Sequence, residues 1–501
     1  MSSRVQLLLA VSLTALAVLA SPQLTEVIGQ EFYYTPPGPP SDPIRAYAAP
    51  SEPASLAEYY SNMSAGGSLP PAAQVPTVPL PITSPAVNDR LGKLEKRLDE
   101  VDAAKSKLPN ATINGAFQAD AVWFNQTSES RDQFGSIESG AGFRRTRLSA
   151  KGSVSETMNY FVQMDFAFFG RPTFTDVWVE QTKVPLLGTV RAGQWKQPFG
   201  LESVSSYRYT TFMERSSLFQ TFVPFRHIGI GFYDNSEDLN TTWAASYFRT
   251  GQDQFGDSLS TDGGNGIASR LTHLLWYCGQ QGEDYLHVGT GYYLNSPPRG
   301  NARFRTIPEI FVGEFAPGGV GTSGQAVPGV LNGTPFFTDT DTIPRVSDIQ
   351  TFGLEALWVR GPLSIQTESM AAVVNQATPT SVLAGTYAQA GYFLTGEHRP
   401  YDRKAGAVDR VLPFNSVGKG GLGAVEVATR WSYIDLDSGS IRGGKMTNVT
   451  SGVNWFINPY CKWVVNYVHS WAEGRDYFPT PSSNLINSQT DAFATRVQLD
   501  F

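Results

Sequence analysis

Two stretches of this chain concentrate arginine and lysine within a sequence that is otherwise acidic. FRRTRLSAK holds Arg144, Arg145, Arg147 and Lys151 and no acidic residue. Residues 191–226 carry five cations against two acids. A guanidinium group suits phosphate well, because its planar fork can bind two oxygens at once. The residue types and their spacing therefore indicate anion binding.

The sequence shows no pattern of residues typical of a catalytic or metal-binding site. The sequence contains no G-x-S-x-G motif. Its two cysteines, Cys278 and Cys461, lack metal-ligand spacing and are interpreted as free thiols. The alternative active site is GEHRPYDRKAG with Glu397, His398 and Asp402, which is more typical of a loop after a strand. We expect no enzyme, metal or cofactor, and the net charge of −7 argues against a nucleic-acid partner.

The N-terminus indicates export. One early cation, Arg4, precedes an apolar run that ends in small residues, which predicts a signal peptide over residues 1–20. The signal is not that of a lipoprotein, because no cysteine lies near the cleavage site. No later run of 18 apolar residues predicts a membrane-spanning helix. An exported chain of this kind can cross a membrane only as a closed β-barrel.

Two segments separate this peptide from the rest of the chain. Residues 21–86 are rich in proline, and 13 of the 33 prolines fall within 30–86, which predicts a disordered linker. Residues 87–108 predict a short coiled coil, because apolar residues recur in alternating steps of four and three. A single amphipathic helix on another surface is the alternative. The apolar positions are Val87, Leu91, Leu94, Leu98 and Val101.

Residues 110–501 alternate between apolar and polar residues. In the last stretch, FATRVQLDF, Phe493 and Val497 share a face with Phe501, whereas Arg496 falls on the other. About 16 such candidate strands, with short turns at one end and long loops at the other, are typical of a transmembrane barrel. A large secreted β-protein is the alternative. The predicted fold is all-β: a 16-stranded antiparallel transmembrane barrel preceded by the Pro-rich linker and the coiled-coil helix.

A barrel would position the two cationic stretches differently. In a strand, Arg145, Arg147 and Lys151 share one face, which should line the lumen, since charge on the lipid face costs about 2–4 kcal/mol at midplane. Arg144 then points outward, near the strand end, where it can reach the interface. Alternation is lost from Pro198 to Pro224, which predicts a loop folded into the barrel as a constriction.

The chain resembles the phosphate-selective porins of the O and P type. The resemblance covers about residues 110–501 and rests on RRTRLSAKG, GQWKQPFGLE, FMERS, LTGEHRPYDRKAGAVDRVLPF, GVNWFINP and TRVQLDF. It implies a trimeric 16-stranded barrel in the outer-membrane lipids, with a third extracellular loop folded inward. The Pro-rich arm and the coil lie outside the resemblance, and we expect the arm to be periplasmic. It also implies that the barrel-assembly machinery reads the terminal Phe501.

The resemblance also implies roles for individual residues. Arg208 falls where such porins carry a constriction cation, and Arg145 matches a pore-lining arginine. Arg147 takes a place where such porins can have an uncharged aromatic residue. Glu214 and Arg215 match the pair that closes the inward loop. The predicted pore or anion-binding residues are Arg145, Arg147, Lys151, Lys196, Arg208 and Arg215, with Glu202 and Glu214 as pairing acids of the constriction loop.

Three functions remain open at this stage. The first is a passive anion-preferring porin, with phosphate or polyphosphate as the physiological solute. The second is a weakly selective porin whose N-terminal arm attaches the outer membrane to the periplasmic cell-wall layer. The third is a barrel enzyme. Phosphate specificity also stays open. The long loop region offers Arg303, Arg305 and Arg345, but the ladder of upper-pore cations of such porins has no clear equivalent here, and Asp253, Asp257 and Asp262 could repel anions.

Overall fold

The computed structural model describes residues 108–167, 172–250, 263–279, 281–310, 312, 334–376, 380–474 and 487–501, with 92, 93 and 96. The predicted signal peptide, the Pro-rich linker and most of the predicted coiled coil lie outside the described residues. So do the acids at 253, 257 and 262. Positions 92, 93 and 96 are helical.

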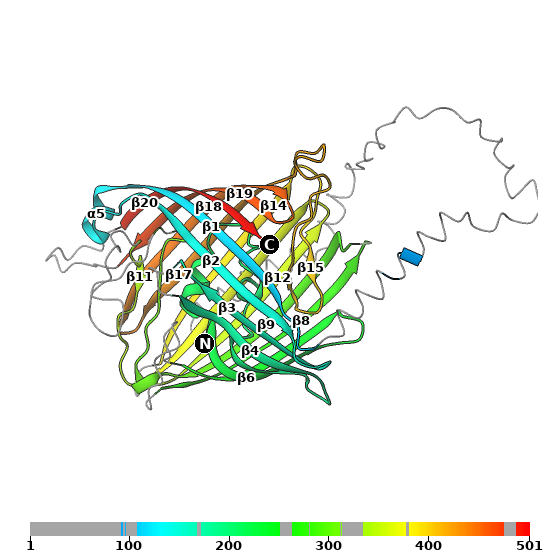
Figure 1. Ribbon diagram of the computed structural model, residues 1–501. Coiled ribbons are helices and arrows are strands. Elements are labelled where there is room, and N and C mark those ends of the chain that lie inside the picture. The colour runs from blue at the N-terminus through cyan, green and yellow to red at the C-terminus, as the bar shows by residue number, and fades with distance from the viewer. Residues whose placement is uncertain are drawn as a thin grey trace, which may run out of the picture. The chain divides into compact units, whose positions relative to one another are not determined.

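Sixteen antiparallel strands close into one barrel (Figure 1), as the alternation predicted. Each strand pairs with its neighbour along the chain, and the last pairs with the first. The barrel strands are β1 (Thr112–Gln126), β2 (Gly140–Ser153), β3 (Met158–Asp165), β4 (Thr173–Val184), β5 (Gly188–Lys196), β6 (Arg226–Asn235), β7 (Thr241–Arg249), β8 (Asn265–Cys278), β9 (Asp284–Ser296), β12 (Val346–Arg360), β13 (Leu363–Gln376), β14 (Ser381–Phe393), β17 (Ala424–Ser438), β18 (Ile441–Asn458), β19 (Cys461–Glu473) and β20 (Asn487–Asp500).

The two faces of the wall differ as the sequence predicted. On β20, Phe493 and Val497 are 49% and 45% exposed, whereas Arg496 and Asp500 are only 2% and 4% exposed. Trp463 and Tyr467 on β19 are likewise exposed on the outside. Lipid would cover these outer side chains, and the inner polar ones face a lumen. Cys278 and Cys461 are free thiols.

The connections at the two ends of the barrel differ in length. Short turns such as 185–187, 361–362 and 459–460 lie at one end, which in outer-membrane barrels is the periplasmic end. The exception is the connection 394–423 between β14 and β17, which holds the hairpin β15 (Tyr401–Asp402) and β16 (Ala407–Val408). The long connections lie at the opposite, extracellular end.

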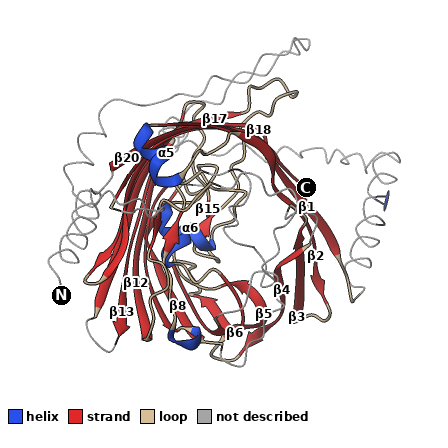
Figure 2. Ribbon diagram, turned by 90° about the vertical axis from the view of Figure 1, so that its left-hand side faces the viewer, coloured by secondary structure: helices blue, strands red, loops and turns tan. Residues whose placement is uncertain are grey.

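Within the described residues, three connections enter the barrel. They are the constriction loop (197–225), with α6 (Leu201–Val204) and α7 (Ser217–Phe222), the described residues of the connection 297–345 (297–310, 312 and 334–345), and the connection 394–423. Figure 2 shows α6 and β15 inside the ring of strands. The remaining elements are α5 (Ser128–Phe134), η1 (Pro298–Gly300), β10 (Arg305–Thr306) and β11 (Thr338–Asp339). No helix in the described part of the chain is long and apolar enough to span a membrane.

Candidate functional site

The constriction loop is packed against the inner wall. The ring of Phe199 fits against Gly291 on β9 and Gly353 on β12, where an added Cβ would come within 2.8 and 3.0 Å of its atoms. Phe199 and Leu201 are fully buried, and Leu218 is 1% exposed. Removing these apolar side chains from water favours the docked loop. The loop thus folds inward, as the loss of alternation predicted.

The middle of the constriction loop is held in place through its main-chain carbonyl groups. Carbonyl oxygens between Arg208 and Glu214 accept hydrogen bonds from side chains of the wall and of the connection 394–423. This fixes the height of the loop in the barrel and occupies several interior cations. The donors are Gln498 to Arg208 O (3.1 Å), Arg399 to Tyr209 O (3.2 Å), Lys462 to Thr210 O (2.9 Å), Asn454 to Thr211 O (2.8 Å), Arg496 to Met213 O and Arg430 to Glu214 O (3.2 Å).

Glu214 binds two arginines of the wall. Its Oε1 lies 2.8 Å from Arg144 Nε and 2.9 Å from Arg496 Nη2. Burial alone would raise the pKa of the Glu214 carboxyl, but the guanidinium groups of Arg144, Arg145 and Arg496 outweigh burial and hold the pKa below its usual range. Glu214 is therefore charged and ties the loop to β2 and β20.

The expectation that Arg144 points outward is wrong. The pairing of β1 with β2 shifts by one residue, so that Gln118 faces Arg145 while the next residue of β1 already faces Phe143. This β-bulge leaves Arg144 opposite no residue, and it turns inward to Glu214. Arg145 stays inward as predicted, so two successive side chains enter the lumen.

Arg430 on β17 joins the constriction loop to the connection 297–345. Its guanidinium lies 3.3 Å from Glu202 Oε1 and 2.6 Å from Glu309 Oε2. Glu309 also accepts a hydrogen bond from the main-chain N–H of Ser217, at 2.8 Å. Burial raises the pKa of Glu202 although Arg430 opposes this shift. Sequence reasoning singled out neither Arg430 nor Glu309.

Three arginines converge on Tyr207 at the tip of the loop. The guanidinium carbons of Arg145, Arg147 and Arg208 lie 5.0, 4.5 and 5.2 Å from the centre of the Tyr207 ring. The Tyr207 hydroxyl is buried and has no hydrogen-bond partner within the described residues. We call Tyr207 and these three arginines the Tyr207 cluster.

The three arginines of the Tyr207 cluster differ in how their charge is balanced. Arg147 Nε lies 2.7 Å from Asp165 Oδ2, and Arg208 Nε lies 3.4 Å from Asp500 Oδ2, too misaligned for a hydrogen bond. Arg145 donates to the neutral side-chain oxygen of Gln118 at 2.7 Å and makes no ion pair with any residue that the structure describes. The cluster thus carries more positive than negative charge.

The other predicted pore cations lie elsewhere. Lys151 is exposed toward the periplasmic end of β2. Lys196 donates to the carbonyl oxygens of 203, 204 and 205 at 2.7 to 3.0 Å. Arg215 donates to the carbonyls of Glu202 (2.8 Å) and Ser205 (2.9 Å) and closes the loop on itself. Arg303 forms an ion pair with Asp339 at 2.5 Å.

The connection 394–423 reaches the constriction loop from the periplasmic end. The Tyr401 hydroxyl hydrogen-bonds His287 Nδ1 at 2.6 Å, and the N–H of Val408 donates to Ser205 Oγ at 3.1 Å. Glu397 and Asp402 accept hydrogen bonds from main-chain N–H groups of this connection, and His398 hydrogen-bonds the carbonyl oxygen of Gln281. The three side chains therefore do not converge on a common site. This segment is a loop after a strand, as interpreted.

A closed sixteen-stranded barrel whose lumen is narrowed by an inward loop and lined by cations defines an outer-membrane porin. Comparison with known families agrees. The model of the family "Phosphate-selective porin O and P" matches residues 112–501, so the chain belongs to this family.

Individual relatives are distant in sequence. The chain is similar to Porin O of Pseudomonas aeruginosa, with 24% identity over 78% of this chain and 88% of that protein. It is also similar to a Caulobacter vibrioides protein, with 25% identity over 72% of this chain and 68% of the other. Among solved structures, an anion-selective porin from Comamonas acidovorans aligns with a TM-score of 0.47 at 11% identity, over 78% of this chain and 99% of that porin.

Proposed function

We propose that this porin is a passive diffusion channel that prefers anions, with phosphate or polyphosphate as its physiological solute. The Tyr207 cluster carries the proposal: three guanidinium groups lie within 5.2 Å of one ring on the loop that narrows the lumen. Arg145, which has no carboxylate partner among the described residues, supplies the excess charge.

Passage of an anion through this point requires no bond to be made or broken. An anion entering the constriction loses part of its hydration shell, and fixed donors replace that water. Arg145, whose described partner is neutral, and Arg208, whose side chain is partly exposed, can offer N–H groups to the anion. Phosphate benefits most, because charge-assisted hydrogen bonds to guanidinium groups are short and strong.

The remaining predicted pore cations take different parts in this proposal. Lys151 and Lys196 add positive potential along the lumen, which raises the local concentration of anions. Arg215 stabilises the loop that carries Arg208, and the pairing acids Glu202 and Glu214 hold that loop to the wall. We also propose a homotrimer, with Phe501 as the signal read by the barrel-assembly machinery. Phe501 is 64% exposed beside β1, where such a partner could reach it.

The test uses Arg208→Glu in a planar lipid bilayer under a KCl gradient. Reversing this charge should reduce the anion preference or turn it into a cation preference, seen as a shift of the reversal potential. Arg131→Glu is the matched control, because Arg131 is exposed on α5 at the extracellular rim. A reversal potential equal to that of the unmodified protein would remove Arg208 from the selectivity site.

A further inference from the structure

A row of planar side chains crosses four neighbouring strands on the periplasmic side of the Tyr207 cluster. It consists of Phe161 on β3, Trp178 on β4, Arg191 on β5 and Tyr233 on β6. The Phe161 and Trp178 rings stack with centroids 5.6 Å apart. The Arg191 guanidinium lies 3.9 Å from the Trp178 ring and 4.9 Å from the Tyr233 ring. We call these four residues the planar row.

The planar row lies on the same part of the wall as the Tyr207 cluster. Arg147 faces Asp165 in the pairing of β2 with β3, and Lys151 faces Phe161. The row is thus four residues further along the strand, or about 13 Å at 3.3 Å per residue. A solute that moves from the cluster toward the periplasm passes the row next.

The planar row adds surface to the lumen rather than charge. Arg191 Nη2 lies 2.6 Å from Glu180 Oε2, and the Tyr233 hydroxyl donates to the same oxygen at 2.7 Å. The carboxylate therefore balances the guanidinium. All four side chains of the row are half-buried, so ring surface stays open to the lumen. Contact between this aromatic surface and water is unfavourable. A planar apolar group of a solute would displace the water and stack on the rings.

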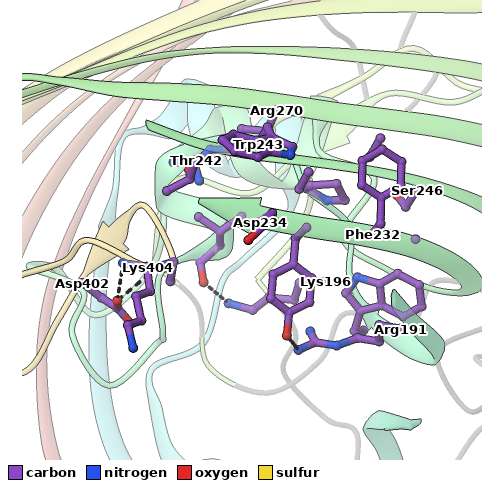
Figure 3. Close-up of a pocket in the computed structure, with 18 of the residues that line it drawn as sticks. Arg191, Lys196, Phe232, Asp234, Thr242, Trp243, Ser246, Arg270, Asp402 and Lys404 are labelled. Atoms are coloured by element: carbon purple, nitrogen blue, oxygen red, sulfur yellow. Dashed lines mark hydrogen bonds between the residues drawn. The ribbon is translucent and has the colours of Figure 1, made fainter. Parts of the chain in front are cut away.

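A cavity of about 360 Å³ adjoins the planar row (Figure 3). Its volume falls within the range of small-molecule sites, about 300–1,000 Å³. Arg191 and Lys196 line one side, and Thr242 and Asp402 line the other. Asp402 Oδ1 accepts the main-chain N–H groups of Lys404 and Ala405, so its other carboxylate oxygen is the acceptor suited to a hydroxyl group of a sugar.

We propose that the pore takes organic phosphates that carry a planar ring, of which a nucleoside monophosphate is the simplest type. The phosphate meets the Tyr207 cluster first. After it has moved on from the cluster, the ring rests against the planar row, and the sugar and phosphate lie in the adjoining cavity beside Lys196. This inference rests on the proposed anion preference, since the cluster must first admit the phosphate.

The test compares three solutes as blockers of chloride current through the full-length protein in a planar bilayer. Inorganic phosphate reports on the cluster alone. Ribose 5-phosphate adds the sugar, and AMP adds the ring. We expect AMP to block at about tenfold lower concentration than ribose 5-phosphate, which corresponds to about 1.4 kcal/mol of ring stacking.

Substitution of one residue of the planar row should remove the difference between the half-blocking concentrations of AMP and ribose 5-phosphate. It should leave block by inorganic phosphate unchanged. Trp178→Leu should bring the half-blocking concentration of AMP to within twofold of that of ribose 5-phosphate and leave inorganic phosphate unchanged. Phe161→Leu serves as a second variant if Trp178→Leu fails to fold. Trp463→Leu, on the outer face, is the matched control and should behave as the unmodified protein.

The outcomes separate this inference from the anion preference. Equal block by AMP and ribose 5-phosphate in the unmodified protein would overturn the ring site while block by inorganic phosphate still supports the cluster. An AMP advantage that survives both row variants would also overturn the ring site. Absence of block by inorganic phosphate would contradict the proposed function itself.

Discussion

Replacing Arg145 by glutamine tests whether the Tyr207 cluster binds phosphate. Glutamine keeps much of the length and the hydrogen bonding of the side chain but removes its charge. Arg145 is suited to this test because its described partner is the neutral Gln118, so the variant leaves no carboxylate without its cation. The same change at Arg147 would leave Asp165 without its partner.

The size of the expected effect follows from Coulomb's law once a distance between the charges is chosen. We take the 5.0 Å between the Arg145 guanidinium and the centre of the Tyr207 ring as the distance to a bound anion. A pair of unit charges at that distance interacts by about 0.8 kcal/mol in bulk water and about 3 kcal/mol at an effective dielectric constant of 20. Arg145→Gln should therefore raise the half-blocking phosphate concentration by about 4- to 200-fold.

The assay is titration of phosphate against chloride current in a planar bilayer. Arg131→Gln removes an equivalent charge from the exposed helix α5 and should stay within twofold of the unmodified protein. Half-blocking concentrations that agree among the two variants and the unmodified protein would refute the reasoning, because Arg145 would then contribute nothing to the site.

Three further changes test how the barrel holds its parts. Arg430→Leu leaves Glu202 and Glu309 without their shared cation, which should lower the stability of the docked loops by about 3–5 kcal/mol. Single-channel conductance should therefore rise as the loops loosen, and unchanged conductance would contradict this role of Arg430. Gly115→Val places a side chain within 2.3 Å of the Phe501 ring and should lower the yield of folded barrel in the outer membrane, whereas a normal yield would show that the ring moves aside without consequence. Deletion of residues 22–107 should leave conductance and selectivity unchanged, because the sixteen strands close from Thr112 onward; altered selectivity would show that this arm contributes to the pore.

Alternation predicted the wall of the barrel well, because one residue in two must meet lipid. It also predicted which side chains of β20 face inward. It failed at Arg144, since a β-bulge inserts one residue and the sequence of β2 carries no mark of the shift in its pairing with β1. A register depends on two strands at once, and a pattern within one strand cannot report it.

The interior was less predictable than the wall. Loss of alternation after Pro198 indicated the constriction loop, because its aromatic residues would be poorly placed in water. Nothing comparable marked the connection 394–423, whose polar sequence is typical of an exposed loop although Tyr401 is buried against His287. Alternation placed Arg496 on the inward face, whereas Arg430 was not singled out. The use of both as anchors for the loop depends on contacts between residues more than 200 positions apart.

The reversal potential of the purified full-length protein in a planar bilayer under a KCl gradient tests the central claim most directly. The net positive charge of the Tyr207 cluster predicts a potential of the sign that chloride permeation produces, together with block of the chloride current by added phosphate. A potential near zero or of the opposite sign, without block by phosphate, would contradict the claim that this porin selects anions.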